Sequence, residues 1–123
     1  MYSQTFWDHV RHPRNDRTLP DAKTGEARYQ RCGDRLTLYI QTENGRITQA
    51  TFKARACAPV VAVASLATEM IQGLELDAAR KLDIFQLDRK LGGIPPSKRH
   101  AYLLFLECLN KSLNEKLADE RNN

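Results

Sequence analysis

Alternating apolar and polar side chains predict the strands of this chain. From Leu36 to Ile40 every second residue is apolar, which is typical of a strand with one buried face. Residues 47–54 carry β-branched and aromatic side chains, and the preceding segment 43–46 reads Glu-Asn-Gly-Arg, an Asn-Gly hairpin turn. A weaker strand is predicted at residues 27–31. Short turns between these segments predict a three-stranded antiparallel sheet in sequential order.

Apolar residues at helical spacing predict helices in the rest of the chain. The predicted helical segments are residues 3–12, which end before Pro13; Pro59 to Gln72, followed by Gly73; two short pieces within Leu76 to Leu91, followed by Gly92-Gly93; and a long final helix from Ser97 or Lys98 to about Ala118. Residues 15–26 are polar, contain proline and glycine, and are predicted to form a mobile connector. Residues 94–98 should be extended, because Pro95 and Pro96 lack a backbone donor and disfavour helical geometry in the residue before them.

These elements predict an α+β fold, in which a small three-stranded antiparallel sheet is packed with helices and a long helix ends the chain. A length of 123 residues suffices for one hydrophobic core and is too short for two, so we expect a single domain over residues 1–123. Charged residues make up 28% and hydrophobic residues 41% of the chain, which is ordinary for a globular protein.

Charge and hydropathy argue against two classes of partner. The net charge is only +4, and lysines and arginines are spread along the chain apart from Lys98-Arg99-His100. We therefore expect no nucleic-acid partner, and an acidic protein is at least as good an alternative. No apolar run reaches membrane-spanning length, and the N-terminus lacks the pattern of a secretory signal. We expect a cytoplasmic protein without a membrane partner.

Cys57 lies where a strand pattern gives way to a helix pattern that has Pro59 in its first turn. A helix N-terminus stabilises a thiolate, the form that binds metal or attacks sulfur, so we expect a lowered pKa for Cys57. The alternative is that Cys57 is a small core residue. In a reducing compartment, however, three cysteines, an odd number, indicate metal or redox chemistry before structural disulfides.

Four residues with metal-ligand chemistry lie at the ends of predicted elements: Cys32, Asp34, Cys57 and His100. The third strand runs back to finish beside the start of the second, so Cys32 and Cys57 should share one end of the sheet. His100, in the first turn of the last helix, could point across that end. Two thiolates, an imidazole and a carboxylate suit zinc, and such ligands also suit iron-sulfur clusters.

Two of these four residues also have a simpler interpretation. Asp34 follows a glycine and could be a turn residue, and His100 could cap a helix within a basic patch. His9 and His12 flank the end of the first helix and are predicted to be solvated or capping side chains. Cys108 is two helical turns beyond Ala101, about 10 Å along the axis, so it is predicted to be a core residue away from the site.

The motifs of this chain resemble those of the IscU/NifU N-terminal type of iron-sulfur cluster assembly scaffold, in the same order and over nearly the whole length. The matching segments are Tyr2-Ser3 through Asp8-His9, Pro13-Arg14-Asn15, Cys32-Gly33-Asp34, Cys57 followed by Ala64-Ser65-Leu66-Ala67-Thr68-Glu69, and Pro95-Pro96-Ser97-Lys98-Arg99-His100. The resemblance implies a three-stranded sheet packed with helices. It also implies a scaffold that is not itself an enzyme and has no catalytic residue.

The resemblance further implies a cargo and partners. Cys32, Asp34, Cys57 and His100 would hold a labile [2Fe-2S] cluster, or zinc as an alternative. A cysteine desulfurase would supply the sulfur. An Hsp70-type chaperone would recognise the segment Ile94, Pro95, Pro96, Ser97 and Lys98.

The chain departs from the family pattern in the chaperone segment, where Ile94 and Ser97 replace Leu and Val, and in two of its ligand motifs. Where the family has His-Cys, this chain has His100-Ala101, so one sulfur ligand is absent, and Ala56 and Ala58 replace the glycines that flank Cys57. The remaining four ligands suffice for zinc. One alternative is therefore a degenerate homologue that acts as a zinc-binding or regulatory desulfurase-binding module without assembling clusters. Another is a sulfur carrier with Cys57 as persulfide acceptor.

Overall fold

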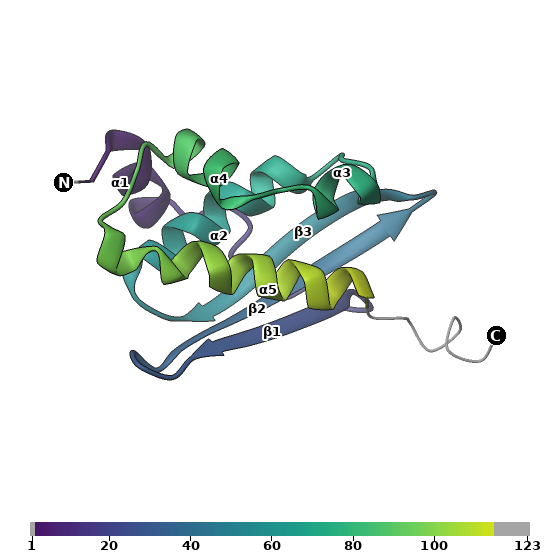
Figure 1. The fold of residues 1–123 in the computed structure, drawn as a ribbon. Helices are drawn as coiled ribbons and strands as arrows, with labels where there is room; N and C mark the ends of the chain where they lie inside the picture. The colour runs from purple at the N-terminus through teal and green to yellow at the C-terminus, as the bar shows by residue number, and fades with distance from the viewer. Residues whose placement is uncertain (1, 115–123) are drawn as a thin grey trace.

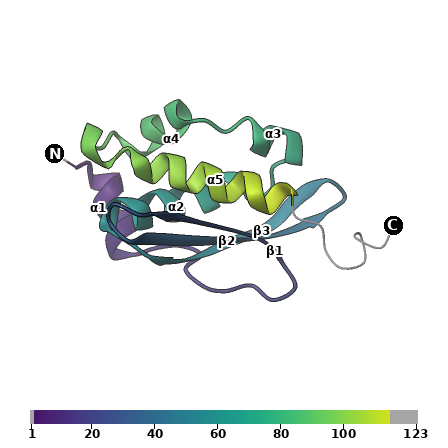
Figure 2. The same ribbon diagram turned by 60° about the horizontal axis from the view of Figure 1, so that its bottom comes forward.

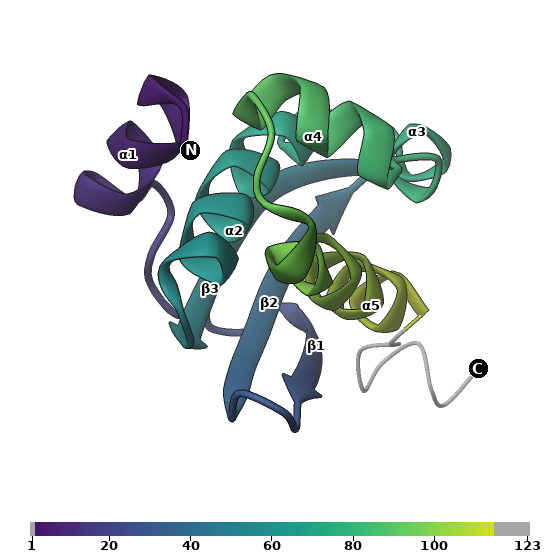
Figure 3. The ribbon, with the colours of Figure 1, turned by 60° about the vertical axis from the view of Figure 1, so that its left-hand side comes forward.

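A computed structural model describes residues 2–114, and Figure 1 shows its elements along the chain. Three strands form one antiparallel sheet in the order β1-β2-β3, which confirms the predicted α+β fold. The elements are α1 (Gln4–Arg11), β1 (Lys23–Tyr29), β2 (Asp34–Glu43), β3 (Arg46–Arg55), α2 (Ala58–Ile71), α3 (Leu76–Arg80), α4 (Ile84–Leu91), the 3₁₀ turn η1 (Pro96–Lys98) and α5 (His100–Asn114). Helices α2 and α5 lie against the sheet, α3 and α4 pack on these two helices, and α1 lies beside α2 (Figure 3).

The turn between β2 and β3 is the predicted Asn-Gly hairpin. Asn44 and Gly45 both have positive φ, 52° and 77°, as a tight turn matched to the twist of its strands requires. The strands then run back antiparallel, so Arg35 near the start of β2 pairs with Arg55 at the end of β3. The start of β2 and the end of β3 therefore lie at the same end of the sheet, as predicted.

The first strand begins earlier than predicted. It pairs with β2 from Lys23 to Tyr29, and residues 30–33 form the turn to β2 instead of continuing the strand. The prediction of a mobile connector over residues 15–26 is therefore wrong from Lys23 onward. Asn15, the first residue of that predicted connector, is also fixed in place, because its carbonyl accepts a hydrogen bond from the Phe52 N–H at 2.9 Å.

The core lies between the inner face of the sheet and the helices that cover it. Leu36, Leu38 and Ile40 of β2 are fully buried, which confirms the period-2 prediction. Helix α2 is apolar nearly all round, because it packs on β3 on one side and on α1, α4 and α5 on others. Among the described residues, no helix has the length and apolar character needed to cross a bilayer.

The segment before the last helix differs from its prediction. Residues 94–98 are not extended throughout, because Pro96–Lys98 form the 3₁₀ turn, whose last N–H donates to the Pro95 carbonyl at 2.9 Å. Proline fits a first turn because its φ is already near the helical value and its missing donor would have no partner there. Helix α5 consequently begins at His100, later than predicted, and its predicted end near Ala118 lies outside the described residues.

Helix α5 crosses β1 at very short range. A Cβ atom added to Gly25 would lie 2.1 Å from the Cys108 carbonyl oxygen and 2.8 Å from the Ser112 nitrogen. Only glycine allows this approach of backbone to backbone. Gly25 therefore sets the spacing between β1 and the helix whose first residue is His100.

We expect Gly25→Ala to lower the free energy of unfolding by about 3 kcal/mol, because the added methyl group must push α5 away from the sheet. Gly45→Ala is the matched control, since its methyl group would meet no atom within 4 Å and only the positive φ is unfavourable, at about 1 kcal/mol. Urea denaturation of both variants measures the difference. Equal losses would mean that α5 does not rest on Gly25.

Candidate metal centre

Four chain segments bring side chains to one end of the sheet. Cys32 lies in the turn between β1 and β2, Asp34 is the first residue of β2, Cys57 is the N-cap of α2 just after β3, and His100 is the first residue of α5. The ends of these elements face the viewer in Figure 3. The predicted convergence follows from the antiparallel order, because β2 lies between its two neighbours.

Asp34 is the centre of the polar contacts at this end. The residue is 3% exposed, and its Oδ1 accepts a hydrogen bond from the Cys57 backbone N–H at 2.9 Å. Its Oδ2 lies 3.0 Å from His100 Nε2 and accepts a bond from the Cys57 thiol at 3.4 Å. Burial acts to raise the pKa of Asp34, but these hydrogen bonds outweigh burial and hold the pKa below its usual value. Asp34 is thus an ionised acceptor rather than a plain turn residue.

His100 is oriented by two neighbours and leaves one nitrogen free. Its side chain is 8% exposed, and its ring stacks on that of Tyr29 with centroids 4.1 Å apart and an interplanar angle of 13°. Nε2 faces Asp34, whereas Nδ1 is buried and has no hydrogen-bond partner among residues 2–114. An unpaired buried polar atom costs about 1–3 kcal/mol, so this nitrogen, beside other donor atoms, fits a ligand that the polypeptide does not supply.

Tyr29 was not predicted to belong to the site. It is the last residue of β1 and pairs with Asp34 across the β1–β2 ladder, so both side chains point to the face of the sheet that α5 covers. The pairing of Tyr29 with Asp34 would have indicated that Tyr29 belongs to the site. The sequence did not reveal this pairing, because the predicted strand continued to Arg31, past the residue at which β1 ends.

Cys32 completes a compact group of three ligand residues. Its N–H donates to the Tyr29 carbonyl at 3.3 Å, and the following Gly33 has a φ of 70°, so a tight turn presents the exposed thiol. One ligand atom each from Cys32, Asp34 and His100 lies within 4.8 Å of the other two. Ligand atoms around tetrahedral zinc are about 3.5 Å apart, given metal–ligand bonds of roughly 2.0–2.3 Å. A small closure would therefore suffice, and these residues fit a metal ion.

Cys57 is attached to this group through Asp34 and is not one of its three members. The prediction that its pKa is lowered is wrong. Burial raises the pKa of this half-buried thiol, and the hydrogen bond to Asp34 and the charge of that carboxylate raise it further. The Val60 N–H at the mouth of α2 lowers the pKa, as expected for a helix N-terminus, but by less than burial raises it. A metal that binds Cys57 must displace the proton that the thiol shares with Asp34.

Two other positions of interest lie in the core. Cys108 is fully buried, donates to the Leu36 carbonyl at 3.3 Å, and has a pKa that burial raises to about 12. This confirms that it is a core residue. Ala101 is also fully buried and, being alanine, offers no donor atom next to His100.

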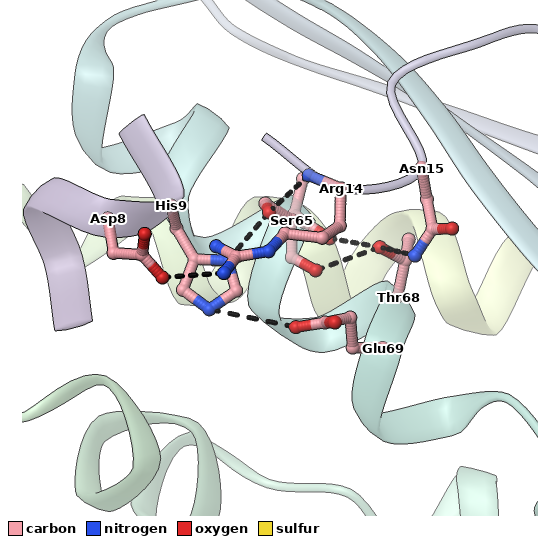
Figure 4. Close-up of polar contacts among 8 residues, drawn as sticks. Asp8, His9, Arg14, Asn15, Ser65, Thr68 and Glu69 are labelled. Carbon is pink, nitrogen blue, oxygen red and sulfur yellow. Dashed lines mark hydrogen bonds and ion pairs between the residues drawn. The ribbon is translucent and has the colours of Figure 1, made fainter. Parts of the chain in front are cut away.

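A second polar cluster joins the first helix to α2, and Figure 4 shows it. We call it the α1 clasp and define it as Asp8, His9, Arg14, Asn15, Ser65, Thr68 and Glu69. His9 Nδ1 lies 2.6 Å from Ser65 Oγ, which also accepts a bond from the Arg14 backbone N–H at 2.9 Å. The prediction that His9 is solvated or capping is wrong, because the residue is 4% exposed. Burial first, and then the Arg14 charge, lower its pKa.

The rest of the clasp holds the chain as it leaves α1. Asn15 Nδ2 donates to Thr68 Oγ1 at 3.1 Å, and Arg14 Nη2 donates to Asp8 Oδ2 at 2.5 Å. His12 lies outside the clasp; it is exposed and its backbone N–H caps α1 through the Asp8 carbonyl. The clasp therefore positions α1 on the helix whose N-cap is Cys57.

The chain is similar to known proteins over most of its length. The family model of the NifU-like N-terminal domain matches residues 1–120. The protein is 34% identical to iron-sulfur cluster assembly scaffold protein IscU 1 of Archaeoglobus fulgidus over 114 residues, which cover 92% of this chain and 74% of the relative. It is 34% identical to the scaffold protein IscU of Azotobacter vinelandii over 119 residues, which cover 93% of this chain and 92% of the relative.

A solved structure shows the same fold. It is the crystal structure of an iron-sulfur cluster assembly scaffold protein ascribed to the SUF system of Fervidobacterium islandicum AW-1, and it superposes with a TM-score of 0.76 at 22% identity. The match covers 92% of this chain and 96% of that one. Together with the family model and the identity to the IscU proteins, this establishes that the chain belongs to the NifU-like N-terminal domain family.

Proposed function

We propose that the protein is an iron-sulfur cluster assembly scaffold that holds its cargo with Cys32, Asp34, Cys57 and His100. The observation that carries this proposal is that Cys32, Asp34 and His100 cluster at one end of a NifU-like fold, with the Cys57 thiol hydrogen-bonded to Asp34. Relatives named as scaffold proteins, with 34% identity, support it. The cargo would be a [2Fe-2S] cluster, with zinc as the alternative occupant.

The donor set suits a cargo that must be given up again. Thiolates and imidazole are established ligands of iron-sulfur clusters. A carboxylate is a harder and poorer ligand for this chemistry than a thiolate, so Asp34 would keep the cluster labile. Cys32 is exposed, and a cluster held there would be open to a receiving protein. We assign no catalytic residue to the protein, because its side chains would hold and release the cargo.

We infer two partners, a cysteine desulfurase that supplies sulfur and an Hsp70-type chaperone. The chaperone segment comprises Ile94, Pro95, Pro96, Ser97 and Lys98, in which Pro96 and Ser97 are exposed while Ile94 is 8% exposed. Full recognition of this segment would therefore require Ile94 to leave the core. We place this activity in the cytoplasm, where the three unpaired cysteines would stay reduced.

A second candidate function is a zinc-binding or regulatory module that binds the desulfurase without building clusters. One observation favours it. Position 101 carries a buried methyl group instead of a sulfur ligand. A site with few sulfur ligands favours a redox-inert ion such as zinc over a cluster.

The ligand set is tested by serine substitutions at the cysteines. Loss of a group that is hydrogen-bonded to a metal ligand weakens metal binding roughly 10–100-fold. We expect Cys32→Ser and Cys57→Ser each to weaken zinc binding by more than this, because each removes a ligand itself. Cys108→Ser is the matched control and should bind zinc like the parent, because Cys108 lies in the core. Competition with a chromogenic chelator measures the affinities. Loss of zinc from Cys108→Ser alone would overturn the assignment.

The role of Asp34 is tested by cluster lifetime after anaerobic reconstitution with desulfurase, iron and cysteine. We expect Asp34→Ala to lose its cluster severalfold more slowly than the parent, because the poorest ligand is gone. Asp34→Asn serves as a control, since its amide oxygen can still accept the bond from the Cys57 N–H. The decay of visible absorption gives the rates. An Asp34→Ala cluster that decays as fast as the parent's would remove Asp34 from the site.

The choice between the two candidate functions is tested by Ala101→Cys, which restores the sulfur ligand that the family resemblance implies. We expect more iron and sulfide per chain than in the parent after identical reconstitution, because sulfur ligands suit clusters best. Leu103→Cys is the control, since it adds a thiol to the same helix at a position that is 58% exposed. Equal cluster content in parent and Ala101→Cys, with both folded, would favour the module without assembly activity.

A further inference from the structure

Three arginines form a row across the outer face of the sheet, the face opposite the helices. Arg28 of β1 pairs with Arg35 of β2, and Arg35 pairs with Arg55 of β3. Directly paired residues of antiparallel strands point to the same face, and all three are exposed. We call this set the arginine row. In Figure 2 the helices lie on the other side of the sheet, and the connection from α1 to β1 passes along this side.

The row is not neutralised by the described part of the chain. Glu26 Oε1 lies 3.3 Å from Arg28 Nε and 4.0 Å from Arg35 Nε, so one carboxylate serves two guanidinium groups. Arg55 has no ion pair among the described residues, and neither does the exposed Arg31 in the adjoining turn. Like charges directly opposite each other destabilise a sheet. Fold stability therefore does not explain the row.

The arginine row and the candidate metal centre lie on opposite faces of the same end of the sheet. Arg28 directly precedes Tyr29, Arg35 directly follows Asp34, and Arg55 is two residues before Cys57. Successive residues of a strand point to opposite faces, so the arginines occupy the outer face at the sheet end that carries the site on its inner face. A partner on the row would be near the exposed Cys32, which lies in the turn at the same end of the sheet.

We propose that the arginine row is the docking surface for a carboxylate-rich patch on the protein that delivers sulfur to the site. This inference rests on the proposed function, because it presumes that such a delivery occurs. Guanidinium groups bind carboxylates through two parallel hydrogen bonds, which favours both orientation and attraction. Such a charge pattern speeds association of the two proteins.

The dimensions and neighbours of the row favour a protein over a nucleic acid. Three strands at about 4.8 Å spacing make the row about 10 Å wide, which matches a local cluster of carboxylates. The next residues along the same face include Glu26 and, near Lys53, Asp16. These carboxylates would repel a phosphate backbone that continued along the sheet. The net charge of only +4 points the same way.

The test compares two triple variants that remove the same charge. One is Arg28→Gln, Arg35→Gln and Arg55→Gln; the control is Arg46→Gln, Arg80→Gln and Lys81→Gln, at the opposite end of the molecule (Figure 1). The probe is the cysteine desulfurase of the same organism, and stopped-flow fluorescence gives association rates at low and high salt. We expect the first variant to associate at least about tenfold more slowly at low salt and to lose its salt dependence. The control should behave like the parent.

Two further measurements keep the outcomes distinct. All proteins are also loaded with iron and inorganic sulfide in the absence of the desulfurase. If the parent forms no cluster under these conditions, the proposed function is wrong. If the arginine variant associates with the desulfurase as fast as the parent does, only the docking surface is wrong. A fluorescent DNA duplex is the second probe. The proposal would be contradicted if the parent bound this duplex in a salt-dependent way, the arginine variant did not, and both associated with the desulfurase at the same rate. The row would then be a nucleic-acid surface.

Discussion

The hydrogen bonds of Asp34 hold together the end of the molecule on which its function depends. One buried carboxylate binds the backbone N–H and the thiol of Cys57 and faces Nε2 of His100. It thereby links the start of β2 to the N-terminal ends of α2 and α5, which are distant in sequence. A buried charge is stable only with such partners. If Cys57 becomes a ligand, its thiol must leave Asp34 Oδ2, so binding of a metal would be coupled to this contact between β2 and α2.

The elements behind the site fix its geometry. Gly25 lets α5 approach β1 closely, which determines where His100 lies relative to Tyr29 and the sheet. The α1 clasp attaches the first helix to α2 through the buried Ser65 hydroxyl, and α2 carries Cys57 at its N-cap. Backbone packing and a second polar network therefore hold the candidate ligands, while the exposed Cys32 lies in the turn between β1 and β2.

Local patterns predicted most of the fold and the four candidate ligands. The alternation around Leu38 and the Asn-Gly turn gave β2 and β3, and the antiparallel order then brought Asp34 and Cys57 together. Three features could not be obtained this way. The first strand has few apolar residues because Gly25 makes room for α5, so its bounds and the role of Tyr29 were missed. His9 gives no local sign of burial, since its partner Ser65 is 56 residues away. The pKa of Cys57 depends on burial and also on the Asp34 carboxylate, which together outweigh the helix N-terminus.

The central claim is that two thiols, one carboxylate and one imidazole act together as ligands, although only three of these residues are clustered in the structure. X-ray absorption at the zinc edge of the zinc-loaded protein tests it most directly, because zinc–sulfur bonds of about 2.3 Å separate from zinc–nitrogen and zinc–oxygen bonds of about 2.0–2.1 Å. The account predicts two sulfur and two lighter neighbours per zinc, from Cys32, Cys57, Asp34 and His100. A single sulfur neighbour would mean that Cys57 stays bound to Asp34, and three would bring in Cys108; either result would contradict the account.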